Sequence, residues 1–324
     1  MYHKEMKRLA CIIIASAMIT MNMNGQDRNE VIKYYNDGAN AIQTNPQAAI
    51  AAFENVITLS DKVGESAADL KQKAIEVLPG LYVKVASNLL NEKKPAPEII
   101  RAAKKAAAEA DKYANATAKE NAGRILVQAY YNMGVDLFSK KDYNNALLAF
   151  DSLLTINPGY SSAIFNKAII YSRQNNSDKF EENIDLFIEK TKSTNDSVKA
   201  KQASKLALEY FRAAGSKLDQ ANKLDEALVQ LNKAAKYGDD KDLDYFFSDV
   251  YNKQKKFDSA AEYARKGLNL ETGDATAKAK YYFQLGLAQV GKGQNAEACA
   301  SFKNAVYGAF AEAAKAERKN LKCQ

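Results

Sequence analysis

Few residues in this 324-residue chain have the type and spacing that catalysis needs. The single histidine, His3, lies near the N-terminus, so the rest of the chain lacks the commonest general base and metal ligand. Adjacent carboxylates at Glu181 and Glu182, and at Asp239 and Asp240, could serve glycoside chemistry, but such pairs are ordinary where a helix meets water. The sequence has no glycine-rich phosphate loop and no metal-type cysteine spacing. We expect no enzyme activity, metal or cofactor.

The N-terminal segment has the pattern of a secretory signal. Lys4, Lys7 and Arg8 precede an apolar run over residues 9–19, which is shorter than the roughly 20 apolar residues of a membrane-spanning helix. We therefore predict that residues 1–25 are a signal peptide and that the mature chain has no membrane span. The chain would be exported to the periplasm, or to the periplasmic face of the outer membrane, of a Gram-negative bacterium.

The details of this segment stay open. Cleavage after Gly25 keeps the longer apolar run, cleavage after Ala17 has the better small residues, and Met6 could be the true start. The alternative to a signal is a buried N-terminal helix. Cys11 lies at the front of the apolar run rather than after its end, so we expect no lipid anchor.

Cys299 and Cys323 remain after such processing. In an oxidising compartment they could form a disulfide bond that stabilises the C-terminal end by about 3 kcal/mol. The alternative is a small apolar Cys299 in the core and a frayed Cys323. Both interpretations stay open, because bonding requires two neighbouring Cα atoms that the sequence does not place, and neither is catalytic.

The charge of the chain does not favour nucleic acid as a partner. The formal net charge is +7, but the lysines lie beside carboxylates, as in RAAKKAAAEADK over residues 101–112. This distribution is typical of a solvated helix face. No motif of an RNA- or DNA-binding family accompanies it, so we expect no nucleic-acid binding.

The elements that would position any binding residues are helical hairpins, most clearly over residues 130–158. Apolar residues recur there every three or four positions in two runs, which predicts two amphipathic helices. Asp142 is a plausible N-cap of the second helix, and Pro158 ends it. Gly134 and Ala146 stand where the helices would cross, because small residues allow close approach, and Phe150 would fill the space beside them.

This hairpin resembles the tetratricopeptide repeat, which has an aromatic residue, Leu, Gly, Tyr, Ala, Phe and Pro at set places in about 34 residues. Those places are held here by Tyr130, Met133, Gly134, Leu137, Ala146, Phe150 and Pro158. Repeats of this family contact mainly their neighbours and stack into a right-handed α-solenoid with one concave face. The resemblance implies an all-α chain that acts as a protein- or peptide-binding scaffold or adaptor of the cell envelope.

The Gly-to-Ala spacing of this hairpin recurs along the chain. Further copies place small residues and apolar partners at Ala168 and Phe180; Gly215, Ala227 and Leu231; Ser248 and Ala260; and Gly286, Ala298 and Phe302. Gly38, Ala49 and Phe53 form another copy, with a turn one residue shorter. With a diverged copy near Ala86 this predicts about seven hairpins, some with lengthened first helices. We expect a repeat domain over residues 26–310 and a polar C-terminal capping helix over residues 311–324.

The resemblance also implies which residues face the groove. The position three residues before each crossing point holds Tyr35, Val83, Tyr131, Phe165, Arg212, Tyr245 and Phe283. In this family the position contacts peptides or partner helices, so the aromatic members predict a ladder of binding contacts. The alternative is that the rings are core, because aromatic stripes at helical spacing usually are.

Two more groove residues, Asn132 and Asn166, match one position of the family's carboxylate clamp, but Val135 and Ile169 occupy another where Asn is needed. We therefore expect no clamp of that type. The predicted ligand is a protein or peptide, and the alternative is an envelope glycan that binds the same rings. The sequence does not predict the oligomeric state.

Overall fold

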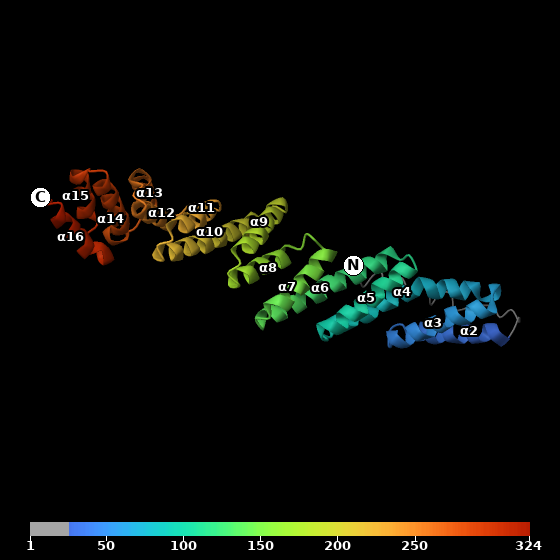
Figure 1. Cartoon of the computed structure of the whole chain (residues 1–324). Helices are drawn as coiled ribbons and strands as arrows, with labels where there is room; N and C mark the ends of the chain where they lie inside the picture. Colours follow the sequence, from blue (N-terminus) through green and yellow to red (C-terminus); the bar gives the residue numbers. More distant parts are fainter. Residues whose placement is uncertain (1–25) are drawn as a thin grey trace. The chain divides into compact units, whose positions relative to one another are not determined.

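The computed structural model describes residues 26–324, so the expected signal segment, His3 and Cys11 lie outside the described residues. Helices joined by short turns make up this part of the chain, and no strand occurs in it (Figure 1). The expected all-α fold is confirmed. Contacts divide the chain into an N-terminal unit that ends at Ala163 and a C-terminal unit, Ile164–Gln324. The boundary falls inside one helix, α8 (Ser161–Arg173).

Three helical hairpins form the described part of the N-terminal unit. They are α2 (Gln26–Ala41) with α3 (Pro46–Val63), α4 (Ala68–Asn91) with α5 (Ala96–Lys112), and α6 (Ala116–Ser139) with α7 (Tyr143–Ile156). A 3₁₀ turn, η1 (Glu65–Ala67), precedes α4. Each helix packs on the next, so the core is a series of layers that includes the buried Phe53, Leu78 and Leu126.

The C-terminal unit continues the pattern. After α8 it contains α9 (Ser177–Ser193), α10 (Ser197–Gln220), α11 (Leu224–Ala235), α12 (Lys241–Lys253), α13 (Phe257–Leu270), α14 (Ala275–Gly291), α15 (Asn295–Asn304), η2 (Gly308–Phe310) and α16 (Ala311–Asn320). Its largest fully buried side chains include Phe180, Phe211, Phe247, Tyr281 and Phe302. As expected, some first helices are long: α4, α6 and α10 have 24 residues each.

Local sequence explains where the helices begin and end. The N-cap side chain accepts a hydrogen bond from the backbone N–H three residues later at Asn45, Asn115, Asp142, Asn176, Asp196, Asp240 and Asp274. Such caps satisfy amides that have no partner within the helix. The expected cap at Asp142 is confirmed, and α7 ends at Ile156, just before Asn157 and Pro158.

Small residues at the crossing points are a steric requirement. A Cβ atom on Gly134 would lie 2.6 Å from the ring of Phe150, and one on Gly286 would lie 2.6 Å from the ring of Phe302. Gly215 has the same relation to Leu231, and Gly38 a slightly looser one to Phe53. The facing residues Ala146, Ala227, Ala260 and Ala298 are fully buried.

The hairpin α12–α13 has a serine at the crossing point, where the other hairpins have glycine or alanine. Ser248 is fully buried, and its hydroxyl donates a hydrogen bond of 2.8 Å to the carbonyl oxygen of Ala260 on the facing helix. The larger side chain is therefore accommodated by a polar contact across the crossing, which satisfies a hydroxyl that would otherwise be costly to bury.

Candidate functional site

The residues of the predicted groove row lie on the first helices of the hairpins and differ in exposure. Tyr35 on α2 is buried, as is Val83 on α4. Tyr131, Phe165, Tyr245 and Phe283 are half-buried, and so are Asn166 and Arg212, whereas Asn132 is exposed. Some side chains of the row are therefore buried in the core and others are partly accessible to solvent. Both units contain members of the row.

The half-buried rings pack against other rings. The Tyr131 centroid lies 5.3 Å from that of Tyr160 and 6.2 Å from that of Phe150. Phe165 lies 4.8 Å from Phe187. These tilted contacts have the geometry of stabilising aromatic pairs. One side of each ring thus holds its hairpin together, and a partner could reach only what the hairpin leaves uncovered.

The last ring of the row is covered by the C-terminal turn. Phe283 lies 5.6 Å from Phe302 and 5.4 Å from Phe310 of η2, and Phe310 also lies 6.5 Å from Tyr245. The segment that joins α15 to α16 therefore packs on two rings of the row at this end of the C-terminal unit.

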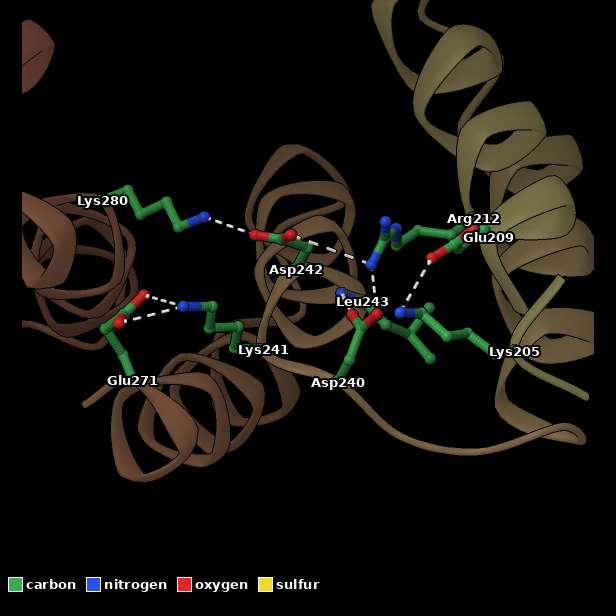
Figure 2. Close-up of polar contacts among 9 residues, drawn as sticks. All are labelled: Lys205, Glu209, Arg212, Asp240, Lys241, Asp242, Leu243, Glu271 and Lys280. Carbon is green, nitrogen blue, oxygen red and sulfur yellow. Dashed lines mark hydrogen bonds and ion pairs between the residues drawn. The ribbon is translucent and has the colours of Figure 1, made fainter. Parts of the chain in front are cut away.

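Arg212 is the one charged member of the row, and its charge is engaged (Figure 2). Its guanidinium on α10 donates to Asp240 at the start of α12 and lies 3.8 Å from Asp242. Lys280 on α14 donates to Asp242 at 2.6 Å, so three first helices are linked by one chain of ion pairs. Asp240 also caps α12 through the N–H of Leu243, at 2.7 Å.

Figure 2 shows two further ion pairs around this chain. Lys241 lies 2.9 Å from Glu271, which is almost fully buried, and Lys205 lies 3.9 Å from Glu209 one turn away on α10. The Lys241 ammonium and the N–H of Gly273 hold the pKa of the Glu271 carboxyl below its usual range. The face around Arg212 is therefore a charged surface whose side chains already have protein partners.

A second polar layer connects the same three helices. Lys253 on α12 donates to both oxygens of Asp219 on α10 at 2.8 Å and lies 2.8 Å from Asp249. Gln284 on α14 donates to Asp249 at 2.8 Å. Burial, reinforced by the nearby Asp249 carboxylate, raises the pKa of Asp219 to about 6. Sequence reasoning missed this layer, because its members are separated by about one repeat along the chain.

Asp244 on α12 is an unusual buried carboxylate. Its side chain is fully buried, and neither carboxylate oxygen has a hydrogen-bond partner among residues 26–324. The nearest cation is Lys266 on α13, whose ammonium lies 3.7 Å away. Burial, with the Asp239 charge nearby, raises the pKa of Asp244 to about 7. Asp244 lies four residues before the crossing residue Ser248. At the same position the other hairpins have Tyr34, Tyr82, Tyr130, Ile164, Phe211 and Tyr282.

The C-terminal end is fastened to the last hairpin. Cys299 on α15 and Cys323 after α16 are disulfide-bonded, with Cα atoms 5.6 Å apart. Arg318 on α16 donates to the carbonyl oxygen of Cys299 at 2.7 Å, and Ala314 is fully buried in the cluster around Phe302. The helix α16 therefore covers the last apolar layer.

Residues 26–324 contain no cluster of His, Cys, Asp and Glu that could hold a metal ion. None of the helices in that range is both long and apolar enough to cross a bilayer.

The comparisons with known proteins concern the last hairpin and the fold. The family model of the tetratricopeptide repeat matches residues 279–307, which span most of α14 and all of α15. No curated protein sequence matches the chain.

Similar solved structures include the MamA protein and two tetratricopeptide repeat proteins. The MamA protein is 20% identical over 61% of this chain and 97% of its own, with a TM-score of 0.35. YrrB, described as a tetratricopeptide repeat protein with an unusual peptide-binding site, is 18% identical over 55% of this chain and 84% of its own, with a TM-score of 0.32. A tetratricopeptide repeat protein from Parabacteroides merdae ATCC 43184 is 16% identical over 92% and 100%, with a TM-score of 0.30.

Proposed function

We propose that this chain, which belongs to the tetratricopeptide-repeat family, is a non-catalytic scaffold that binds a protein or peptide along the first-helix faces of its hairpins. The observation that carries the proposal is the row of half-buried rings on these helices beside the exposed amide of Asn132, with Tyr131 and Asn132 of α6 as its most accessible members in the N-terminal unit. Half-buried aromatic rings held rigid by their neighbours suit a binding surface, because little entropy is lost when a partner covers them.

The pairing of the charged side chains at this row favours a binding role over a catalytic one. The charged groups around Arg212 neutralise one another in ion pairs that connect helices, which is a structural use of charge. The same rings could in principle stack on sugars, and glycan binding is the competing hypothesis. The tilted ring contacts at Phe165 and Phe283 cover part of the surface that stacking on a sugar would require.

Site-specific photo-crosslinking tests the proposal. A photoreactive amino acid would replace the exposed Asn132 in one variant and the exposed Glu120, which lies on another face of α6, in the control. The expected result is a discrete protein adduct in an envelope extract from Asn132 and none from Glu120, with loss of that adduct when Tyr131→Ala is added. Equal adducts from both positions, or binding to a glycan array without any protein adduct, would overturn it.

We also propose that the scaffold works in the cell envelope after export. The basic and apolar pattern of residues 1–25 supports this proposal, and so does the Cys299–Cys323 bond, since disulfides persist mainly in oxidising compartments. Mass-spectrometric reading of the N-terminus of native protein should show removal of about 17 to 25 residues. Recovery of an intact Met1 or Met6 start from the cytosol would contradict export.

A further inference from the structure

Two grooves run along opposite sides of α5 in the N-terminal unit. The first has a volume of about 440 Å³ and lies between α5 and the helices α3 and α4, with Ile50, Tyr82, Val85 and Leu89 on its walls. The second has a volume of about 380 Å³ and lies between α5 and α6. Arg101 lines both of them. The two grooves therefore form one surface with α5 as its central ridge.

This α5 surface differs from the groove row described above. Tyr82 and Tyr130 line the two grooves, and each directly precedes a row residue, Val83 or Tyr131. Neighbouring residues on a helix point about 100° apart, so the two sets of side chains leave the first helices on different sides. A partner on the α5 surface and a partner on the row would contact different faces.

The second groove combines an apolar floor with unpaired positive charge. Pro97, Ile100, Tyr130 and Met133 provide the floor, and the exposed Arg101 and Lys104 line its edge. None of the residues that line this groove is a carboxylate, whereas the first groove is lined by one, Glu98, together with Arg101 and Lys105.

The two cations at that edge have no carboxylate partner in the described part of the chain. The Lys104 ammonium lies 6.0 Å from the centroid of the Tyr130 ring, and neither Lys104 nor Arg101 forms an ion pair there. The next lysine, Lys105, shows the contrast, since it donates to Glu109 on its own helix at 2.7 Å. Unpaired cations beside an apolar floor are complementary to an apolar segment that carries carboxylates.

We propose that the α5 surface is a second docking site, which takes an acidic amphipathic segment of a partner protein. Apolar side chains of the segment enter the grooves beside α5, and its carboxylates pair with Arg101 and Lys104. A positive edge accelerates the approach of an acidic segment and disfavours a basic one. The inference goes beyond the proposed function, because it concerns another face, and either site could fail its test without the other.

Binding of designed peptides to the whole chain tests this assignment. The probe is a fluorescein-labelled amphipathic peptide with leucine on one face and glutamate on the other, and the matched probe has lysine in place of every glutamate. Fluorescence anisotropy should show binding of the glutamate peptide and at least tenfold weaker binding of the lysine peptide. The double variant Arg101→Glu with Lys104→Glu should reverse this preference.

A control variant separates local from overall charge. Lys33→Glu with Lys201→Glu changes the net charge equally at two exposed positions that do not line the grooves, and it should keep the preference for the glutamate peptide. Thermal melts establish that both double variants are folded. Equal binding of both peptides by the unaltered chain, unchanged binding by the α5 variant, or equal loss in the control would overturn the proposal. Self-association that only the α5 variant abolishes would identify a second copy as the occupant instead.

Discussion

The two units use the same hairpins and both pair charges between first helices, but only in the C-terminal unit do such pairs connect three first helices of the described chain. In the C-terminal unit, cations on the first helices bridge neighbouring repeats, as Arg212 does to Asp240 and Lys253 does to Asp219. In the N-terminal unit, Arg28 on α2 likewise pairs with Asp69 on α4, whereas Arg101 and Lys104 on α5 have no carboxylate partner among the described residues and line the grooves beside that helix. Packing residues are set by what a hairpin needs, whereas charged residues are free to vary between repeats. A charge that is paired between first helices holds repeats together, whereas an unpaired one is available to a partner.

A second contrast concerns the position four residues before the crossing point. It carries an aromatic or aliphatic side chain in six hairpins but Asp244 in the hairpin α12–α13. A buried carboxylate without hydrogen bonds is costly unless it takes up a proton. One hairpin of the C-terminal unit is therefore expected to respond to pH where its counterparts in the N-terminal unit do not.

The largest expected effect comes from removing a ring at a crossing point in either unit. Phe150→Ala and Phe302→Ala each empty a fully buried site, so each should lower the free energy of unfolding by about 3 to 5 kcal/mol. Because repeats contact mainly their neighbours, the loss of hydrogen-exchange protection should stay near α6–α7 in the first variant and near α14–α15 in the second. A uniform loss along both units would contradict the comparison and indicate a single cooperative fold.

The next effect is a pH dependence that arises at Asp244. Its pKa is raised to about 7, against about 3.9 for an unfolded chain, so the native state binds the proton more tightly. The stability that this proton provides is complete below about pH 4 and is lost as the pH rises through 7. The free energy of unfolding should fall by at most about 1.4 kcal/mol per pH unit. Urea unfolding followed by circular dichroism at pH 5 and pH 8 measures the slope.

Asp244→Asn should remove most of this slope, and Asp37→Asn is the control at an exposed position of the N-terminal unit. Some slope of the same sign should persist, because the pKa of Asp219 is also raised, to about 6. An unchanged slope in Asp244→Asn would show that the carboxylate is ionised in the native state at both pH values.

These contrasts also show what the sequence could predict. The hairpins and their crossing residues follow from local sterics, because only a small residue fits where Gly134 faces Phe150, and the spacing that reveals this lies within one repeat. The contacts of long charged side chains depend on which neighbour they reach, so RAAKKAAAEADK could be interpreted only as a solvated face. Lys105 does form an ion pair within α5, with Glu109, but Arg101 and Lys104 line grooves. The burial of Asp244 had no sequence signal beyond its departure from the aromatic pattern.

A smaller effect compares the two arginines directly. Arg212→Ala leaves Asp240 and Asp242 close together without their shared cation, and the arginine side chain is only 21% exposed, so we expect a loss of about 1 kcal/mol that shrinks at high salt. Arg101→Ala should change stability by less than about 0.5 kcal/mol, since the side chain is exposed and has no ion pair. Urea midpoints at low and high salt measure both. Equal costs would mean that ion pairing does not distinguish Arg212 from Arg101.

The smallest effect tests whether glycine is required at the crossing points because a side chain there would clash with the facing helix. Gly80 lies on the exposed side of α4, and a Cβ atom there would have no neighbour within 4 Å, so Gly80→Ala should raise stability by about 0.4 to 1 kcal/mol through a less flexible unfolded chain. Gly134→Ala, in the same unit, should lower it, because the added Cβ atom would lie 2.6 Å from the Phe150 ring. Urea unfolding of the two variants beside the unaltered chain measures the difference. The opposite signs are the decisive feature, because helix propensity alone would make both substitutions stabilising. If both raise stability, the close approach at the crossing point is not what holds these hairpins in register.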